Sequence, residues 1–97
     1  MKEYKKVSLD ELYKYLAKTF TKLHEKIYLQ DANNWMDEIR IFEQNAIYDE
    51  YSKLHIYDNI FYNKQGKCER LTIAFKYIYF DDGTVDTEYY LPKNVNI

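Results

Sequence analysis

Glycine, cysteine and histidine are scarce in this chain. Its 97 residues include two glycines, one cysteine and two histidines. Two glycines are too few for a phosphate-binding loop of the P-loop or dinucleotide type. The single cysteine, Cys68, excludes an intramolecular disulfide and favours a reducing compartment. His24 and His55 lack the spacing of a zinc motif, and no nucleophile motif surrounds Cys68. We therefore expect no metal, no cofactor and no enzymatic activity.

Long apolar segments are also missing. No run of 18 apolar residues exists, and the N-terminus lacks the apolar stretch of a signal peptide. Cytoplasmic localisation is therefore the expectation. The length is enough for one domain with one core, so we predict a single domain over residues 1–97. Aromatic residues make up 19% of the chain, which favours a folded protein over a disordered one.

The charge is unevenly distributed along the chain. The net charge is −2, but residues 1–30 hold seven lysines against four acids, a balance of +3. Residues 31–97 hold seven basic residues against twelve acids, a balance of −5. Lysine, asparagine, isoleucine and tyrosine are all frequent, and their AT-rich codons hint at a bacterial mobile element or phage as the source.

The N-terminal third contains a helix signature. Ser8 and Glu11 have the spacing of a capping box. Apolar residues then recur at spacings of three and four, which predicts an amphipathic helix over residues 9–28. The residues of this stripe are Leu9, Leu12, Leu16, Phe20, Leu23 and Ile27.

The opposite side of this predicted helix carries four lysines, namely Lys14, Lys18, Lys22 and Lys26. One interpretation is a stripe that binds nucleic-acid phosphates, together with Lys2, Lys5 and Lys6. The other, which we favour, is a solvated helix face, because lysine is a good helix former on a surface. Asp10 lies four residues before Lys14, the spacing of a helical ion pair.

A second helix is predicted over residues 35–47. Trp35, Ile39, Phe42 and Ala46 keep helical spacing after the turn-prone segment 31–34. Residues 39–41 also alternate like a strand, so a fourth strand at this place remains the alternative.

The segment from Leu71 to Leu91 predicts a long β-hairpin. Asp81, Asp82 and Gly83 suit a three-residue loop with the glycine in the left-handed region. Phe80 then faces Thr84, and the numbers of paired residues sum to 164. The two strand faces separate cleanly only in this register, because a slip by one residue moves every side chain to the other face.

Adding a strand at residues 53–62 gives a three-stranded antiparallel meander with strands 68–80 and 84–91. The fold class is therefore α+β, with helices packed on a three- to four-stranded antiparallel sheet. We expect the N-terminal helix to cover the sheet face that carries Leu54, Ile56, Leu71, Ile73, Phe75, Val85, Tyr89 and Leu91. The other face then offers aromatic and acidic residues, namely Tyr57, Phe61, Ile78, Phe80, Asp86, Glu88 and Tyr90. The alternative is that the second helix covers these aromatic residues through Trp35, Ile39 and Phe42.

Aromatic residues beside acids are typical of a protein-binding surface with a preference for basic partners. The main hypothesis is a small, acidic, non-enzymatic interaction module, such as an inhibitor or anti-defence protein of a phage or mobile element that acts on a basic, nucleic-acid-handling protein. Its predicted protein-binding residues are Tyr57, Phe61, Phe80, Asp86, Glu88 and Tyr90. The alternatives are a nucleic-acid-binding protein that uses the lysine stripe, and a homodimeric scaffold.

Overall fold

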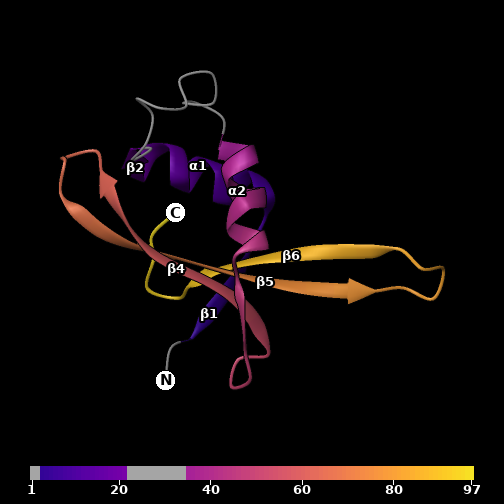
Figure 1. Cartoon of the computed structure of the whole chain (residues 1–97). Coiled ribbons are helices and arrows are strands. Elements are labelled where there is room, and N and C mark those ends of the chain that lie inside the picture. The colour runs from indigo at the N-terminus through magenta and orange to yellow at the C-terminus, as the bar shows by residue number, and fades with distance from the viewer. Residues whose placement is uncertain (1–2, 22–34) are drawn as a thin grey trace.

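The protein consists of two helices and a curled antiparallel sheet of six strands in the residues that the computed structural model describes, 3–21 and 35–97 (Figure 1). The predicted α+β class is confirmed. The helices are α1 (Leu9–Thr19) and α2 (Trp35–Gln44). The strands are β1 (Tyr4–Val7), β2 (Phe20–Thr21), β3 (Ile47–Asp49), β4 (Leu54–Asn63), β5 (Cys68–Tyr79) and β6 (Val85–Pro92).

The predicted meander forms the centre of the sheet. The strand order is β1-β6-β5-β4-β2, and β3 pairs with β4 off this path. The prediction of three to four strands missed β1 and β2, which have four and two residues. A period of two cannot be recognised in segments this short. Their place in the sheet depends on partners distant in sequence, since β1 pairs with β6 and β2 pairs with β4.

Helix α1 begins as predicted but ends earlier. The Ser8 side chain accepts from the Glu11 N–H at 3.0 Å, and the Glu11 carboxylate accepts from the Ser8 N–H at 2.8 Å. The helix ends at Thr19, and the next two residues form β2, so the predicted extent to residue 28 is wrong at this point. Phe20 has the spacing of the helical stripe, yet it lies in β2. Its side chain is fully buried beside Phe61 of β4, with ring centroids 6.2 Å apart. Residues 22–28 of the predicted helix lie outside the described residues.

Helix α2 confirms the second predicted helix over most of its length. It covers Trp35–Gln44, and Trp35, Ile39 and Phe42 are buried as the spacing predicts. The end of the predicted segment differs, because Ile47 begins strand β3. The strand alternative for residues 39–41 is wrong, because they lie inside α2, and β3 begins only after the helix has ended.

The predicted hairpin register is confirmed. Lys76 pairs with Glu88, in agreement with the sum of 164. The Phe80 N–H donates to the Thr84 carbonyl at 3.0 Å, and Gly83 has a φ of 88°. The β4–β5 connection repeats this design, because the Asn63 N–H donates to the Lys67 carbonyl at 2.8 Å and Gly66 has a φ of 79°.

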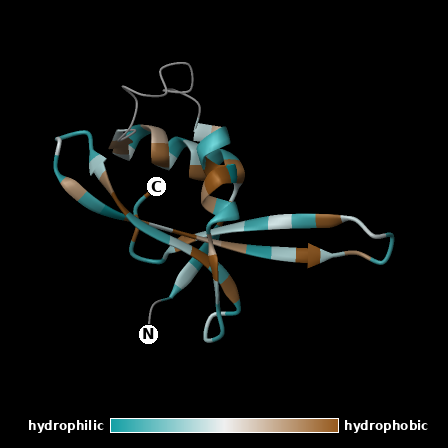
Figure 2. Cartoon of the chain, viewed as in Figure 1, coloured by the Kyte–Doolittle hydropathy of each residue, from teal (hydrophilic) through white to brown (hydrophobic). Residues whose placement is uncertain are grey.

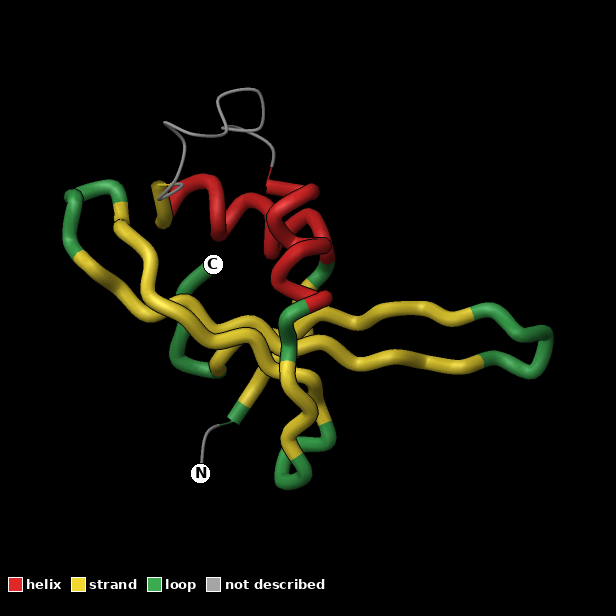
Figure 3. The backbone as a smooth tube through the Cα atoms, viewed as in Figure 1, coloured by secondary structure: helices red, strands yellow, loops and turns green. Residues whose placement is uncertain are grey.

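The two helices lie on one side of the sheet (Figure 3), which we call the helix-covered face; the other side is the open face. The core lies between the helices and the sheet. Its fully buried large side chains are Phe20, Phe75, Leu12, Leu16, Leu71, Ile73 and Leu91.

Strand β4 presents its side chains the other way from the prediction. Tyr57 pairs with Ile73, so it lies on the helix-covered face, whereas Leu54 and Ile56 lie on the open face. The prediction followed the apolar alternation of β4, but the register set by the β4–β5 turn decides the face. Leu54 is nevertheless buried, and it lines a pocket on the open face together with Tyr4, Lys76 and Tyr90.

The far part of the β5–β6 hairpin extends away from the rest of the domain (Figures 1 and 3). Strand β4 pairs with β5 only up to Phe75, and β1 pairs with β6 only from Tyr89 onwards. Between these points, in the described part of the chain, β5 and β6 pair only with each other. We call residues 76–88 the arm.

Candidate protein-interaction surface

The arm carries large apolar side chains that the domain leaves in solvent. Tyr79 is 75% exposed, Phe80 50% and Val85 52%. Figure 2 shows hydrophobic bands on both strands of the arm near its tip. These residues meet at the end of β5 and the start of β6, because Tyr79 pairs with Val85 and Phe80 directly follows Tyr79. The protruding end of the sheet is therefore apolar on both strands.

The loop at the tip is held together by one of its own carboxylates. Asp82 accepts from the Thr84 N–H at 3.0 Å and from the Thr84 hydroxyl at 2.6 Å. The hydroxyl bond and then the backbone bond lower the pKa of Asp82. Asp82 therefore stabilises the turn. Its negative charge adds to the charges of Asp81 and Asp86 near the apolar tip.

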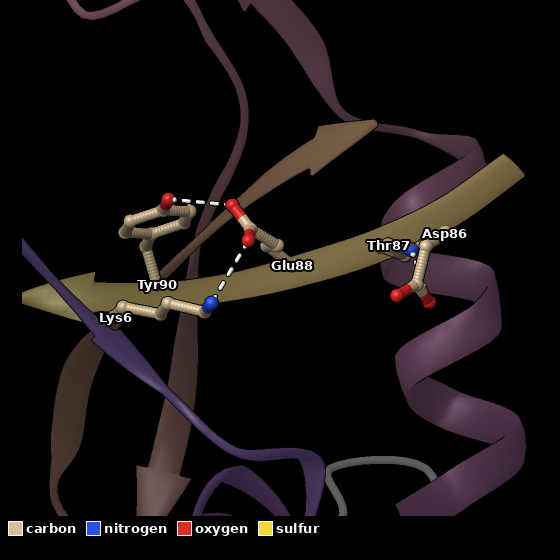
Figure 4. Close-up of polar contacts among 5 residues, drawn as sticks. All are labelled: Lys6, Asp86, Thr87, Glu88 and Tyr90. Atoms are coloured by element: carbon tan, nitrogen blue, oxygen red, sulfur yellow. Dashed lines mark hydrogen bonds and ion pairs between the residues drawn. The ribbon is translucent and has the colours of Figure 1, made fainter. Parts of the chain in front are cut away.

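A polar network lies at the base of the arm on the open face (Figure 4). The Lys6 Nζ donates to the Glu88 Oε2 at 2.8 Å, and the Tyr90 hydroxyl donates to the Glu88 Oε1 at 2.9 Å. The bond from Lys6, followed by the bond from Tyr90, lowers the pKa of Glu88, and the same carboxylate raises the pKa of Lys6. Both oxygens of Glu88 thus have donors, and the side chain is held in place beside β1.

Asp86 makes a different contact on the same strand. Its Oδ1 accepts from the N–H of the next residue, Thr87, at 3.1 Å (Figure 4). The Thr87 N–H points away from β5, since a side chain and not a neighbouring strand accepts its hydrogen bond. This contact shows that the outer edge of β6 is open at Thr87.

The six residues predicted to bind protein do not share one surface. Phe80, Asp86, Glu88 and Tyr90 lie on the open face, as their shared register with β5 requires. Two others, Tyr57 and Phe61, lie on the helix-covered face, and Phe61 is buried. Their neighbour is Phe42 of α2, whose ring stacks on Tyr57 with centroids 4.5 Å apart and meets Phe61 edge-on at 5.6 Å. The candidate surface thus reduces to the arm and its base.

The lysines of the alternative hypothesis occupy several environments. Lys14 forms the predicted ion pair with Asp10 at 3.0 Å, and both side chains are largely exposed. Lys18 lies in the last turn of α1, and Lys6 is paired with Glu88. Lys22 and Lys26 lie outside the described residues. Of the four lysines of the predicted stripe, the structure describes Lys14 and Lys18, both on α1, so the stripe stays a prediction.

Other side chains that could carry chemistry are dispersed. His55 lies between Tyr48 and Tyr77, with ring centroids 5.1 and 4.9 Å away, and Cys68 is exposed at the start of β5. Over residues 3–21 and 35–97, no three side chains of histidine, cysteine, aspartate or glutamate come together as metal ligands. His24 lies outside these ranges.

A pocket on the open face, lined by two carboxylates and several apolar side chains, was not predicted from the sequence. It has a volume of about 350 Å³, and its carboxylates are already engaged. Asp58 accepts from the Arg70 guanidinium at 2.6 Å and from the Thr72 hydroxyl at 2.9 Å. Asp49 accepts from the backbone N–H and the hydroxyl of Ser52 at 2.9 and 2.7 Å. The contacts of Asp58 join residues 12 and 14 positions apart, so no local motif could have indicated them, whereas the contact of Asp49 with Ser52 is local.

Tyr77 links the arm to α2 and should make stability sensitive to high pH. Its hydroxyl donates to Glu43 at 2.9 Å, and burial together with this carboxylate raises the pKa of Tyr77 to about 12. The unfolded chain releases this proton near pH 10, so the stability contributed by the protonated hydroxyl is complete below about pH 10 and is lost towards pH 12. We expect a loss of about 1–2 kcal/mol after allowing for solvent screening.

Urea unfolding at about pH 9 and about pH 11.5 measures this effect. Other tyrosines also have raised pKa values, so Tyr77→Phe is the matched control that isolates the contribution of Tyr77. The wild type should lose more stability than Tyr77→Phe over this interval. Equal losses in the two proteins would contradict the proposed link between the arm and Glu43.

Comparisons with protein-family models, with curated proteins and with solved structures found no match to this chain. Within the described residues, no helix has the length and the apolar composition needed to cross a membrane.

Proposed function

We propose that this protein is a small non-enzymatic interaction module that binds a basic partner protein through the arm. The observation that carries the proposal is the exposure of Tyr79, Phe80 and Val85 at the end of a projecting hairpin. Aromatic side chains supply much of the contact area of protein interfaces. Exposed apolar patches on folded domains mark interaction sites.

The charge of the arm supports a basic partner. Residues 76–88 contain four acids and one lysine, which gives a net charge of −3. Asp81, Asp82 and Asp86 flank the apolar tip, so an apolar contact would be surrounded by negative charge. Such a ring steers a positively charged surface into the encounter and discriminates against acidic partners. Basic surfaces are common in nucleic-acid-handling proteins.

The finer form of the proposal is an inhibitor. A partner surface that recognises phosphates would be blocked when an acidic hairpin occupies it, without any chemistry by this chain. A small protein with a projecting contact element suits that task. An anti-defence protein of a phage or mobile element is the most specific version of this proposal, supported by codon-related composition and small size.

A pull-down with a matched pair of variants tests the proposal. Tyr79→Ser/Phe80→Ser removes the apolar tip, and Ile47→Ser/Tyr48→Ser removes a comparably exposed apolar pair from β3. We expect the arm variant to lower the affinity for a purified, captured partner at least tenfold, because central aromatic residues dominate interface energetics. The β3 variant should bind like the wild type.

The capture should also resist nuclease treatment and weaken moderately with salt. If both double variants keep full affinity, the arm is not the contact element and the proposal fails. Recovery of nucleic acid that falls steeply with salt would instead favour the lysines of α1 as the functional surface.

A further inference from the structure

The outer edge of β6 is open along the arm. Since the Phe80 N–H bonds to the Thr84 carbonyl, alternate pairs of this ladder are hydrogen-bonded, and Asp86 and Glu88 bond to β5. Val85 and Thr87 therefore direct their N–H and C=O groups to the outer edge. The bond from the Thr87 N–H to the Asp86 carboxylate agrees with this direction.

A groove borders this open edge. Strand β1 pairs with β6 up to Val7 opposite Tyr89, and the chain then turns at Ser8 into α1. The space beyond this turn has a volume of about 480 Å³ and is lined by residues 6–9 and 85–89. The groove thus continues the line of β1 beside β6, where an additional strand would lie.

We propose that this groove binds an extended segment of a partner protein as an added strand antiparallel to β6, with alternating basic and apolar side chains. The inference rests on the proposed binding function of the arm and specifies its mode. Strand addition satisfies the open backbone groups of an edge strand, and side-chain contacts then select the partner. The added strand runs in the same direction as β1, which also pairs antiparallel with β6.

The charges of β6 define the side chains of the occupant. Asp86 and Glu88 lie two residues apart on the open face. Glu88 is already paired with Lys6, so Asp86 is the acid that a basic residue of the added strand would lie opposite. A partner carbonyl would replace Asp86 at the Thr87 N–H, which frees the Asp86 carboxylate to pair with a basic side chain. On the helix-covered face, Val7, Leu9 and Val85 line the groove and favour apolar residues.

The same charges argue against a second copy of this chain as occupant. Two β6 edges paired antiparallel with their faces matched place Asp86 opposite Asp86 or Glu88 of the other copy. Like charges directly opposite each other destabilise a strand pair. A basic segment removes this repulsion and converts it into attraction.

The test uses the full chain labelled with nitrogen-15 and a capped peptide of alternating lysine and valine as the probe. We expect amide shifts confined to residues 7–9 and 85–88, slower hydrogen exchange at Thr87 N–H, and weaker binding with added salt. A peptide of alternating glutamate and valine, and a peptide with lysines and valines in separate blocks, should both bind at least tenfold more weakly. Equal binding of either control peptide, or the absence of shifts, overturns the proposal.

Thr87→Pro tests the backbone contact directly. Proline removes the outward N–H and leaves the ladder with β5 intact, because Thr87 donates no bond to β5. Thr87→Val is the matched control, since it keeps the N–H. We expect at least tenfold weaker peptide binding for Thr87→Pro and wild-type binding for Thr87→Val; equal binding by all three overturns the proposal.

Asp86→Asn covers the case in which Thr87→Pro does not fold. The asparagine oxygen can still accept from the Thr87 N–H, but the charge is lost. We expect several-fold weaker binding of the lysine–valine peptide and a flatter salt dependence. Unchanged affinity and salt dependence would overturn the assignment of a basic occupant.

The failure of this inference can be told apart from the failure of the proposed function. If Thr87→Pro captures the purified partner as well as the wild type while Tyr79→Ser/Phe80→Ser does not, strand addition is wrong and the arm still binds. If neither variant loses the partner, the arm proposal fails as well. A wild-type dimer in sedimentation equilibrium that Thr87→Pro dissociates would assign the groove to a second copy and overturn the peptide occupant.

Discussion

Replacing Phe75 with alanine is expected to lower the free energy of unfolding by about 3–5 kcal/mol. Phe75 is fully buried and lies where β5 pairs with both neighbours, opposite His55 of β4 and Tyr89 of β6. Its ring meets Tyr89 edge-on with centroids 5.9 Å apart. A domain of this size has a total free energy of unfolding of about 5–15 kcal/mol, so the variant would keep only a small part of its stability. Urea unfolding followed by circular dichroism measures it.

Phe80→Ala is the matched control for this prediction. It makes the same truncation five residues further along, at the half-exposed tip of the arm. The expected change in unfolding free energy is under about 1 kcal/mol, as for surface substitutions that create no cavity. Losses of equal size at the two positions would mean that the tip packs as core, and the arm would then lose the exposure on which its proposed role depends.

The two hairpins have the same kind of turn, but only one of their registers was predicted from it, and this difference explains which parts of the fold could be predicted. The register of β5 and β6 follows from the three-residue loop ending at Gly83, and the structure agrees with it pair by pair. The turn from Asn63 to Lys67 is also a three-residue loop that ends with a glycine, Gly66. The numbers of paired residues in β4 and β5 therefore sum to 130, which places Tyr57 opposite Ile73. The prediction for β4 relied on apolar alternation instead and obtained the wrong face. Turn geometry therefore determines the register more directly than hydrophobicity in this sheet.

The candidate site could be predicted only where its contacts lie within one hairpin. The pairing of Lys76 with Glu88 follows from the loop between them, and the exposed Phe80 follows from its place beside the turn. The contact of Lys6 with Glu88 joins positions 82 residues apart, and β1 has no alternation that would place it beside β6. The groove along β6 exists because β1 ends at Val7, a boundary that depends on the helix cap at Ser8 and on long-range pairing.

The second large effect is expected for Phe42→Ala, which should lower the free energy of unfolding by about 3–5 kcal/mol. Phe42 is 2% exposed and is the residue of α2 that covers the two β4 aromatics. Removing its ring leaves Tyr57 and Phe61 without their partner and opens a cavity between α2 and the sheet. Ile41→Ala is the matched control on the same helix, because Ile41 is 48% exposed. We expect it to cost under about 1 kcal/mol.

The stability of the Phe42→Ala variant also shows whether the aromatic residues of β4 belong to the core or are available to a partner. If α2 is their cover, Phe42→Ala exposes Tyr57 and Phe61, and the variant should bind a hydrophobic dye under conditions in which Ile41→Ala does not. Partner binding through the tip of the arm should persist in the folded fraction of both variants, since Tyr79, Phe80 and Val85 lie beyond the contact of Tyr77 with α2. If Phe42→Ala is no more destabilising than Ile41→Ala, α2 does not seal this face. Tyr57 and Phe61 would then be available to a partner, and the interaction surface would extend from the arm to both faces of the sheet.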